Sequence, residues 1–271
     1  MKLTYATNSA DRVTGARSLS AESTSALLSG IISECEKRLV VFDLDSTLLD
    51  NRPRNAVITR EFGKLHDQSK LKQAKAEHWQ DWSARHAMLS MGLSHDEIER
   101  LIETYTSYWE ERFFTSQYCQ YDEAISGAVF FVRQLEQSGA IIRYLTGRHE
   151  AMRPGTTSSL TKLGFPAPGL IAATGVNAAP GVHNVELIMK SVQSIPDDDY
   201  KKKAMLDIVD VENDSDIYNN EILAAFDNEP YHINAYRQTF PEATCIHLNT
   251  DHSMRRISLL NGIVSISNFI L

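Results

Sequence analysis

The chain has 271 residues, of which 42% are hydrophobic and 23% are charged, as is usual for a soluble globular protein with a sizeable core. This length predicts one large domain or two modest ones. The formal net charge of −8 argues against a nucleic-acid partner, because an acidic surface repels the phosphate backbone, and any phosphate site needs local positive charge or a metal.

The predicted elements begin with an amphipathic helix over residues 21–36, whose apolar residues fall on one stripe. Five short apolar runs follow, each ending in polar or turn residues: Leu39–Phe42, Ile141–Leu145, Glu186–Met189, Ile222–Phe226 and Cys245–Leu248. Helix-like segments lie between several of these runs. Apolar strands that alternate with helices predict an α/β fold, with a doubly wound, mostly parallel, Rossmann-like sheet covered on both faces.

The interval from residue 51 to about residue 125 contains helix signals and no strand-like run. Ser94 and Glu97 have the spacing of a capping box, and apolar residues with helical spacing follow them. A connection of roughly 75 residues is too long for a simple loop in a compact domain. We therefore expect a catalytic core formed by residues 1–50 and 126–271, with a helical cap over residues 51–125 inserted between the first and second core strands.

Polar residues stand just after several of the predicted strands. Parallel sheets bind ligands at the carboxyl ends of their strands, so these residues are expected to converge on one rim. The residues after the strands are Asp43 and Asp45 after the first run, Thr146, Gly147 and Arg148 after the second, and Asp227, Asn228 and Glu229 after the fourth. Three lysines, Lys201, Lys202 and Lys203, stand at the start of the helix between the third and fourth runs.

This set of residues points to phosphoryl chemistry assisted by a metal ion. Carboxylates crowded at one site repel each other unless a cation neutralises them, and oxygen ligands suit Mg²⁺. A lysine and a hydroxyl near the metal suit a phosphoryl group. Asp43 and Asp45 are two positions apart and share one side of an extended backbone, so one could attack while the other handles protons.

Four segments resemble the motifs of the haloacid dehalogenase (HAD) superfamily. They are "DLDST", "LTGR", the lysine after "DDDY", and "FDNEP", and they follow the order of that superfamily between about residues 38 and 250. The helical insert lies where this superfamily places its C1-type cap. The resemblance implies a phosphatase branch enzyme, namely a Mg²⁺-dependent phosphohydrolase that cleaves a small phosphomonoester.

The resemblance also implies a role for each motif residue. Asp43 would be the nucleophile that forms an aspartyl-phosphate, and Asp45 would protonate the leaving oxygen and then activate water. Asp43, Asp227 and the backbone carbonyl of Asp45 would hold Mg²⁺. Thr146, Gly147 and Lys201 would bind the phosphoryl group.

Two motifs depart from the common pattern or leave alternatives open. Glu229 stands after Asn228 where many relatives carry a second aspartate, so its contact with the metal is open. Lys201 shares an apolar helix face with Ala204, Met205 and Ile208, and the superfamily's aromatic-then-lysine pattern favours it, while Lys202 and Lys190 remain candidates. The roles of Arg148 and His149 are also open.

Other functions on the same scaffold are a phosphomutase, a dehalogenase or a catalytically silent binding protein. Asp45 argues against a dehalogenase, because a halide leaves without a proton. We expect a small phosphorylated metabolite as partner, no nucleic acid and no membrane, with substrate and oligomeric state left open. Cys35, Cys119 and Cys245 show no metal or redox spacing, and neither a signal peptide nor a membrane span is evident, so the expected location is the cytoplasm.

Overall fold

The computed structural model describes residues 17–169, 184–213, 222–253 and 255–271. Its centre is a seven-stranded sheet with the order β1-β9-β8-β7-β2-β5-β6, in which all neighbouring strands are parallel. Within these ranges, no helix has the length and apolar character needed to cross a membrane.

All five predicted strands are present, and two further strands complete the sheet. The predicted strands are β2 (Leu39–Phe42), β5 (Ile141–His149), β6 (Val185–Lys190), β7 (Ile222–Asp227) and β8 (Thr244–Leu248). The unpredicted edge strands are β1 (Arg17–Ser18) and β9 (Val264–Ile266), which are too short to show a clear apolar pattern.

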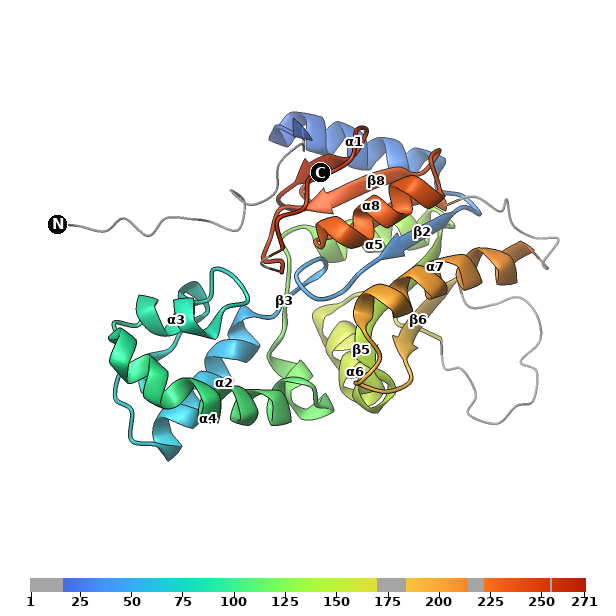
Figure 1. Ribbon diagram of the computed structural model, residues 1–271. Helices are drawn as coiled ribbons and strands as arrows, with labels where there is room; N and C mark the ends of the chain where they lie inside the picture. Colours follow the sequence, from blue (N-terminus) through green and yellow to red (C-terminus); the bar gives the residue numbers. More distant parts are fainter. Residues whose placement is uncertain (1–16, 170–183, 214–221, 254) are drawn as a thin grey trace.

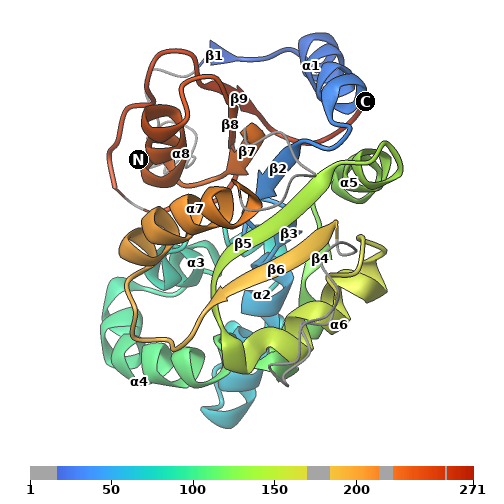
Figure 2. The ribbon, with the colours of Figure 1, turned by 90° about the vertical axis from the view of Figure 1, so that its right-hand side faces the viewer.

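Helices cover both faces of the sheet, as Figure 2 shows. One face carries α1 (Ala21–Glu34), α5 (Ala128–Gln137) and α6 (Arg153–Leu163), and the other carries α7 (Asp197–Asn213) and α8 (Pro230–Thr239). The central strand β2 serves both layers because successive side chains point to opposite faces. Val40 and Phe42 lie in the core beneath α1 and α5, whereas Leu39 and Val41 lie in the core beneath α7 and α8.

The long interval between β2 and β5 is mainly helical and lies beside the core in Figure 1. It contains α2 (Arg52–Leu65), α3 (Ala84–Ser90) and α4 (His95–Phe113), with short 3₁₀ turns at Leu71–Gln73, Ala76–His78 and Ser116–Tyr121. We call residues 51–125 the helical insert. It has its own apolar core, which includes Phe62, Trp79 and Tyr105.

The helical insert begins and ends at a short antiparallel pair, β3 (Leu49–Asp50) with β4 (Glu123–Ala124). The capping box at the start of α4 is present, with Ser94 accepting from the Glu97 amide and the Glu97 carboxylate accepting from the Ser94 amide. The division of the chain into two domains at residues 50 and 126 stays a prediction.

Gly155 brings α6 close to the last turn of the helical insert. Its backbone N–H donates to the Ser116 hydroxyl at 3.1 Å, and a Cβ added at Gly155 would lie 2.1 Å from the Ser116 carbonyl oxygen. Because this carbonyl belongs to the backbone, neither α6 nor the Ser116 segment can move away without distorting the main chain. The small size of Gly155 therefore allows the core helix after β5 to contact the insert.

We expect Gly155→Ala to lower the free energy of unfolding by about 1–3 kcal/mol, the usual cost of overpacking. The matched control is Gly30→Ala in α1, where an added Cβ meets nothing within 4 Å. That change should raise stability by about 0.5–1 kcal/mol, because alanine is the better helix former. Urea unfolding measures both, and equal stability of the two variants would contradict the packing described here.

Candidate active site

The site is built around the end of strand β2. The buried run Leu39–Phe42 brings Asp43 to the carboxyl edge of the sheet, where its side chain is 6% exposed. The chain then turns sharply, with Ser46 in the left-handed region at φ 59°. The Ser46 amide donates to the Leu49 carbonyl at 2.7 Å, which holds this unfavourable conformation in place.

The Lys201 ammonium group bridges two buried carboxylates. Its Nζ lies 2.6 Å from Asp43 Oδ1 and 2.8 Å from Asp227 Oδ2. The pKa of Asp43 is raised to about 7, chiefly by burial. The Lys201 charge lowers this pKa, and the Asp227 charge raises it. Burial would also raise the pKa of Asp227, but Lys201 and then His232 outweigh it and hold that pKa well below its usual range.

Thr47 connects the ends of β2 and β7. Its hydroxyl donates to Asp43 Oδ2 at 2.9 Å and accepts from the Asn228 amide at 3.1 Å. The Glu229 amide donates to Asp227 Oδ1 at 2.8 Å. These bonds orient both carboxylates, so that the two sequence motifs, far apart in the chain, act as one structural unit.

The segment after β5 contacts Asp45 rather than Asp43. Thr146 is fully buried, and its hydroxyl oxygen lies 3.4 Å from Asp45 Oδ2. Arg148 binds the same carboxylate with two donors, Nη2 to Oδ1 at 2.7 Å and Nε to Oδ2 at 2.9 Å. Burial alone would raise the pKa of Asp45, but the opposing effect of the nearby cations, chiefly Arg148, is larger and lowers this pKa to about 2. Asp45 is therefore ionised in this structure at neutral pH.

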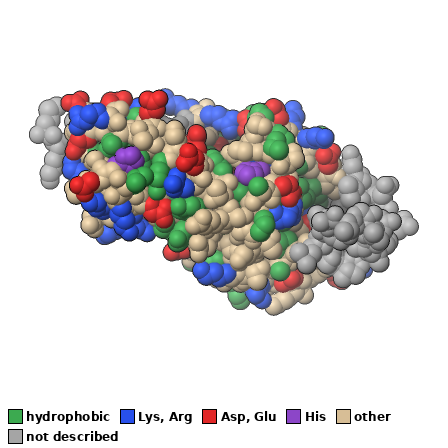
Figure 3. Space-filling model, turned by 90° about the horizontal axis from the view of Figure 1, so that it is seen from below, with side chains coloured by type: hydrophobic (Ala, Val, Ile, Leu, Met, Phe, Trp, Pro, Cys, Tyr) green, Lys and Arg blue, Asp and Glu red, His purple; other side chains and the backbone are tan. Residues whose placement is uncertain are grey.

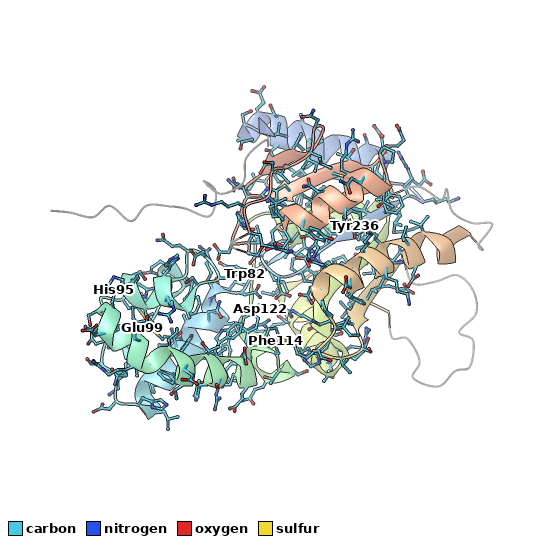
Figure 4. The ribbon with its side chains drawn as sticks, in the orientation of Figure 1. Trp82, His95, Glu99, Phe114, Asp122 and Tyr236 are labelled. Atoms are coloured by element: carbon cyan, nitrogen blue, oxygen red, sulfur yellow. The ribbon has the colours of Figure 1, made fainter. Side chains whose placement is uncertain are left out.

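A chain of alternating charges continues from Asp45 into the helical insert. Arg148 Nη2 also donates to Asp122 Oδ2 at 2.8 Å, and Asp122 pairs with Arg54, whose Nε lies 2.8 Å from Asp122 Oδ1. The Arg54 and Asp122 side chains are both fully buried. Figure 4 shows Asp122 between the core and the insert. The network thus ties a motif carboxylate to the base of α2.

The donor groups at the site suit a hard divalent cation. Across the described ranges, no group of three or more His, Cys, Asp or Glu side chains is arranged to hold a metal ion. The carboxylates of Asp43 and Asp227 nevertheless lie close together, because both contact the Lys201 ammonium. Two carboxylates, with water and substrate oxygens, are ligands of the kind that Mg²⁺ accepts. These two carboxylates fit Mg²⁺, and its binding stays a prediction.

Comparisons with solved structures bear on this architecture. A candidate phosphatase from Clostridium difficile is similar over 86% of this chain and 95% of its own, at 12% identity and a TM-score of 0.50. The chain shares the overall fold of this candidate phosphatase. The expected doubly wound α/β fold is therefore confirmed, and so is the resemblance at the level of the fold. No protein-family model and no curated protein sequence matches the chain.

Two further structures show the same relationship at lower similarity. A hydrolase of the haloacid dehalogenase-like family from Streptococcus pneumoniae is 14% identical, with 84% of this chain and 93% of its own covered and a TM-score of 0.43. A predicted phosphoglycolate phosphatase from Haemophilus somnus is 14% identical, with 86% and 94% covered and a TM-score of 0.44. At such identities the likeness concerns the fold alone.

The structure distinguishes the candidate lysines by position. Lys201 is 4% exposed and contacts Asp43, whereas Lys202 and Lys203 are exposed. Lys190 donates to Asp197 Oδ1 at 2.6 Å. Asp197 also packs against Gly147, where an added Cβ would lie 2.6 Å from Asp197 Oδ2. Lys201 is thus the lysine that the structure brings to Asp43.

The residues left open by the motifs have defined contacts as well. The Glu229 carboxylate accepts from the Ser253 hydroxyl at 2.7 Å and from the Ser253 amide, and lies 3.6 Å from Arg255. His149 Nε2 lies 3.2 Å from the Phe114 carbonyl oxygen, so His149 contacts the insert just after α4. Glu229 is therefore held by the loop after β8, and His149 stabilises the junction between core and insert.

Several site residues had no signal in the sequence motifs. They are Arg54, Asp122, His232, Ser253 and Arg255. His232 lies on α8 with Nδ1 3.6 Å from Asp227 Oδ1 and Nε2 3.0 Å from Asp198 Oδ1. The sequence signal available for His232 was its position one helical turn after Asn228, which places it next to the same strand end.

We expect Arg54→Met to destabilise the protein by about 3–5 kcal/mol, because it removes one partner of a fully buried ion pair. Arg52→Met is the matched control on the same helix, since Arg52 pairs with Asp50 and is 42% exposed. That change should cost about 0–1 kcal/mol, as for other exposed ion pairs. Urea unfolding of both variants decides, and similar losses would show that the buried network does not stabilise the fold.

Proposed function

We propose that the protein is a Mg²⁺-dependent phosphohydrolase that cleaves a small phosphomonoester through an aspartyl-phosphate on Asp43. The observation that carries the proposal is the pairing of Asp43 with the Lys201 ammonium at 2.6 Å, with a second carboxylate, Asp45, held separately by Arg148. A nucleophile beside a cation and an independent proton-transfer group are the two parts that such a reaction needs.

In the first step, a carboxylate oxygen of Asp43 attacks the phosphorus atom of the substrate. The bond between phosphorus and the ester oxygen breaks, and its electron pair stays on the leaving oxygen. Asp45, which is ionised in the free protein, takes up a proton from the monoanion of the bound phosphomonoester or from solvent and gives it to that oxygen, so that an alcohol leaves. Lys201, Thr146 and the backbone at Gly147 hold the phosphoryl oxygens during the transfer. Mg²⁺, when bound, would neutralise negative charge on the carboxylates and the phosphoryl group.

In the second step, water attacks the phosphorus atom of the aspartyl-phosphate. Asp45, now ionised, accepts a proton from this water, and the bond between phosphorus and the Asp43 oxygen breaks. Inorganic phosphate leaves, and the Asp43 carboxylate is restored. Arg148 supports this second role, because the guanidinium contact orients the Asp45 carboxylate and favours its ionised form.

The expected partner is a small phosphorylated metabolite. On the face seen in Figure 3, acidic and basic side chains are interspersed, which does not favour a nucleic-acid backbone. The three cysteines are free and buried, in keeping with the cytoplasmic location that we propose.

The proposal is tested with a panel of phosphorylated metabolites, assayed for released phosphate with Mg²⁺ and with EDTA. We expect Mg²⁺-dependent release from at least one phosphomonoester and its loss on addition of EDTA. Asp43→Asn should lower the rate to the background level, because it removes the nucleophile while keeping the size of the side chain.

The same panel separates the other functions. Activity that requires a bisphosphate cofactor would indicate a phosphomutase, and halide release from a haloacid without phosphatase activity would indicate a dehalogenase. Folded protein without turnover of any phosphomonoester would contradict the proposal and favour a binding protein.

A further inference from the structure

A cavity of about 530 Å³ lies between the core and the helical insert. Its core side includes Asp43, Asp45 and Lys201, and its insert side includes residues of α2, α3 and α4. The volume is within the usual range for small-molecule sites. The group that remains attached to the ester oxygen of a substrate would therefore occupy the insert side.

Aromatic side chains form much of that side. The Trp109 and Phe113 rings are stacked, with centroids 4.5 Å apart, and Phe114 meets Trp109 edge-on at 5.5 Å. The Trp109 N–H donates to Asn55 Oδ1 at 2.7 Å, which fixes the ring. Trp82 also lines the cavity and is 48% exposed, and Figure 4 shows Trp82 and Phe114 near the gap between insert and core. Such rings offer flat apolar surface to a ligand.

The arginines that line the cavity are already paired with carboxylates. The pairs are Arg52 with Asp50, Arg54 with Asp122, Arg85 with Glu99, Arg148 with Asp45 and Arg255 with Asp198. A leaving group with a negative charge of its own would compete with these carboxylates for the guanidinium N–H groups, and full contact at a buried pair would require displacing the carboxylate. For the buried partners of Arg54 and Arg148, that would leave an unpaired charge inside the protein. The cavity therefore favours an uncharged leaving group.

Trp79 supplies a polar feature on the insert side. Its side chain is 3% exposed and lines the cavity, and its indole N–H has no hydrogen-bond partner among the described residues. A buried donor without a partner is costly, at about 1–3 kcal/mol, so an acceptor on a ligand would gain from meeting it. An aromatic ring with a carbonyl oxygen or ring nitrogen carries such an acceptor.

We propose that the substrate is a phosphomonoester whose leaving group contains a flat, uncharged aromatic ring with a hydrogen-bond acceptor. This rests on the proposed phosphohydrolase function and narrows its substrate class. Aryl-methyl phosphates and nucleoside monophosphates share this chemistry, whereas short carboxylated phosphates such as phosphoglycolate lack the ring and carry a second charge.

The kinetic test compares substrates with leaving groups of similar intrinsic reactivity. Benzyl phosphate should exceed cyclohexylmethyl phosphate in kcat/KM by roughly 2- to 13-fold, the value of one aromatic contact. 4-Carbamoylbenzyl phosphate should exceed 4-carboxybenzyl phosphate in kcat/KM by about 10-fold or more. The arginines of the cavity are already paired, so the carboxylate of the second substrate would lie near acidic side chains of the same charge. Nucleoside monophosphates are assayed beside these aryl-methyl phosphates to distinguish the two sources of the ring, and phosphoglycolate serves as the substrate without a ring.

Variants assign these preferences to the cavity. Trp82→Ala should reduce the benzyl preference to near 1. In the wild type, the carbonyl acceptor should give 4-carbamoylbenzyl phosphate a kcat/KM roughly 2- to 13-fold above that of benzyl phosphate, and Trp79→Phe should remove this advantage. The control is Phe130→Ala, since Phe130 lies on α5, is 58% exposed and does not line the cavity. It should leave every ratio unchanged.

A binding measurement keeps the inference independent of turnover. All three tryptophans line the cavity, so intrinsic fluorescence reports on it directly. Benzylphosphonate should quench this fluorescence at lower concentration than cyclohexylmethylphosphonate. This order supports the inference even in a protein without phosphatase activity, which would overturn the proposed function alone. Equal binding of the two phosphonates, or hydrolysis with equal kcat/KM for the ring and its saturated counterpart, would overturn the aromatic substrate class.

Discussion

The structure depends on one buried cation between two buried carboxylates. Asp43 and Asp227 end adjacent strands, and burying both is unfavourable unless a positive charge compensates them. Lys201 supplies that charge at 2.6 and 2.8 Å. It reaches the site because it shares one face of α7 with the buried residues Ala204 and Met205, which pack in the core beneath this helix. Hydrophobic packing of a helix therefore sets the position of a charge in the candidate active site.

A second cation links the chemistry to the helical insert. Arg148 binds Asp45 on one side and Asp122 on the other, and Asp122 binds Arg54 at the start of α2. Asp45, which we propose as the proton-transfer group, and the base of the insert are thus held by one buried network. The same insert supplies the aromatic side of the cavity, so any change in its position would alter both the orientation of Asp45 and the space for a leaving group.

Much of the fold and of the motif residues could be predicted because the signals are local. Continuous apolar runs mark the central strands, and polar residues at their ends, such as Asp43 and Asp227, follow from the geometry of parallel sheets. Helical spacing allowed both Lys201 and Lys202, and the aromatic-then-lysine pattern of the resemblance favoured Lys201, which is the lysine that contacts Asp43. The pair of Arg54 with Asp122 could not be predicted, because its members are 68 positions apart and neither lies in a periodic pattern that indicates the other. The aromatic residues of the insert posed a similar problem, since spacing alone does not separate core from cavity.

The most direct test of the account is the identity of the residue that carries the phosphoryl group during turnover. Asp45→Asn keeps the size of the side chain but removes the base for the second step, so the covalent intermediate should accumulate. We would mix this variant with p-nitrophenyl phosphate and Mg²⁺, quench rapidly with acid and locate the modification by peptide mass spectrometry. The account predicts one phosphoryl group on Asp43. A phosphoryl group on another residue, or steady turnover by the variant at the wild-type rate without any adduct, would contradict it.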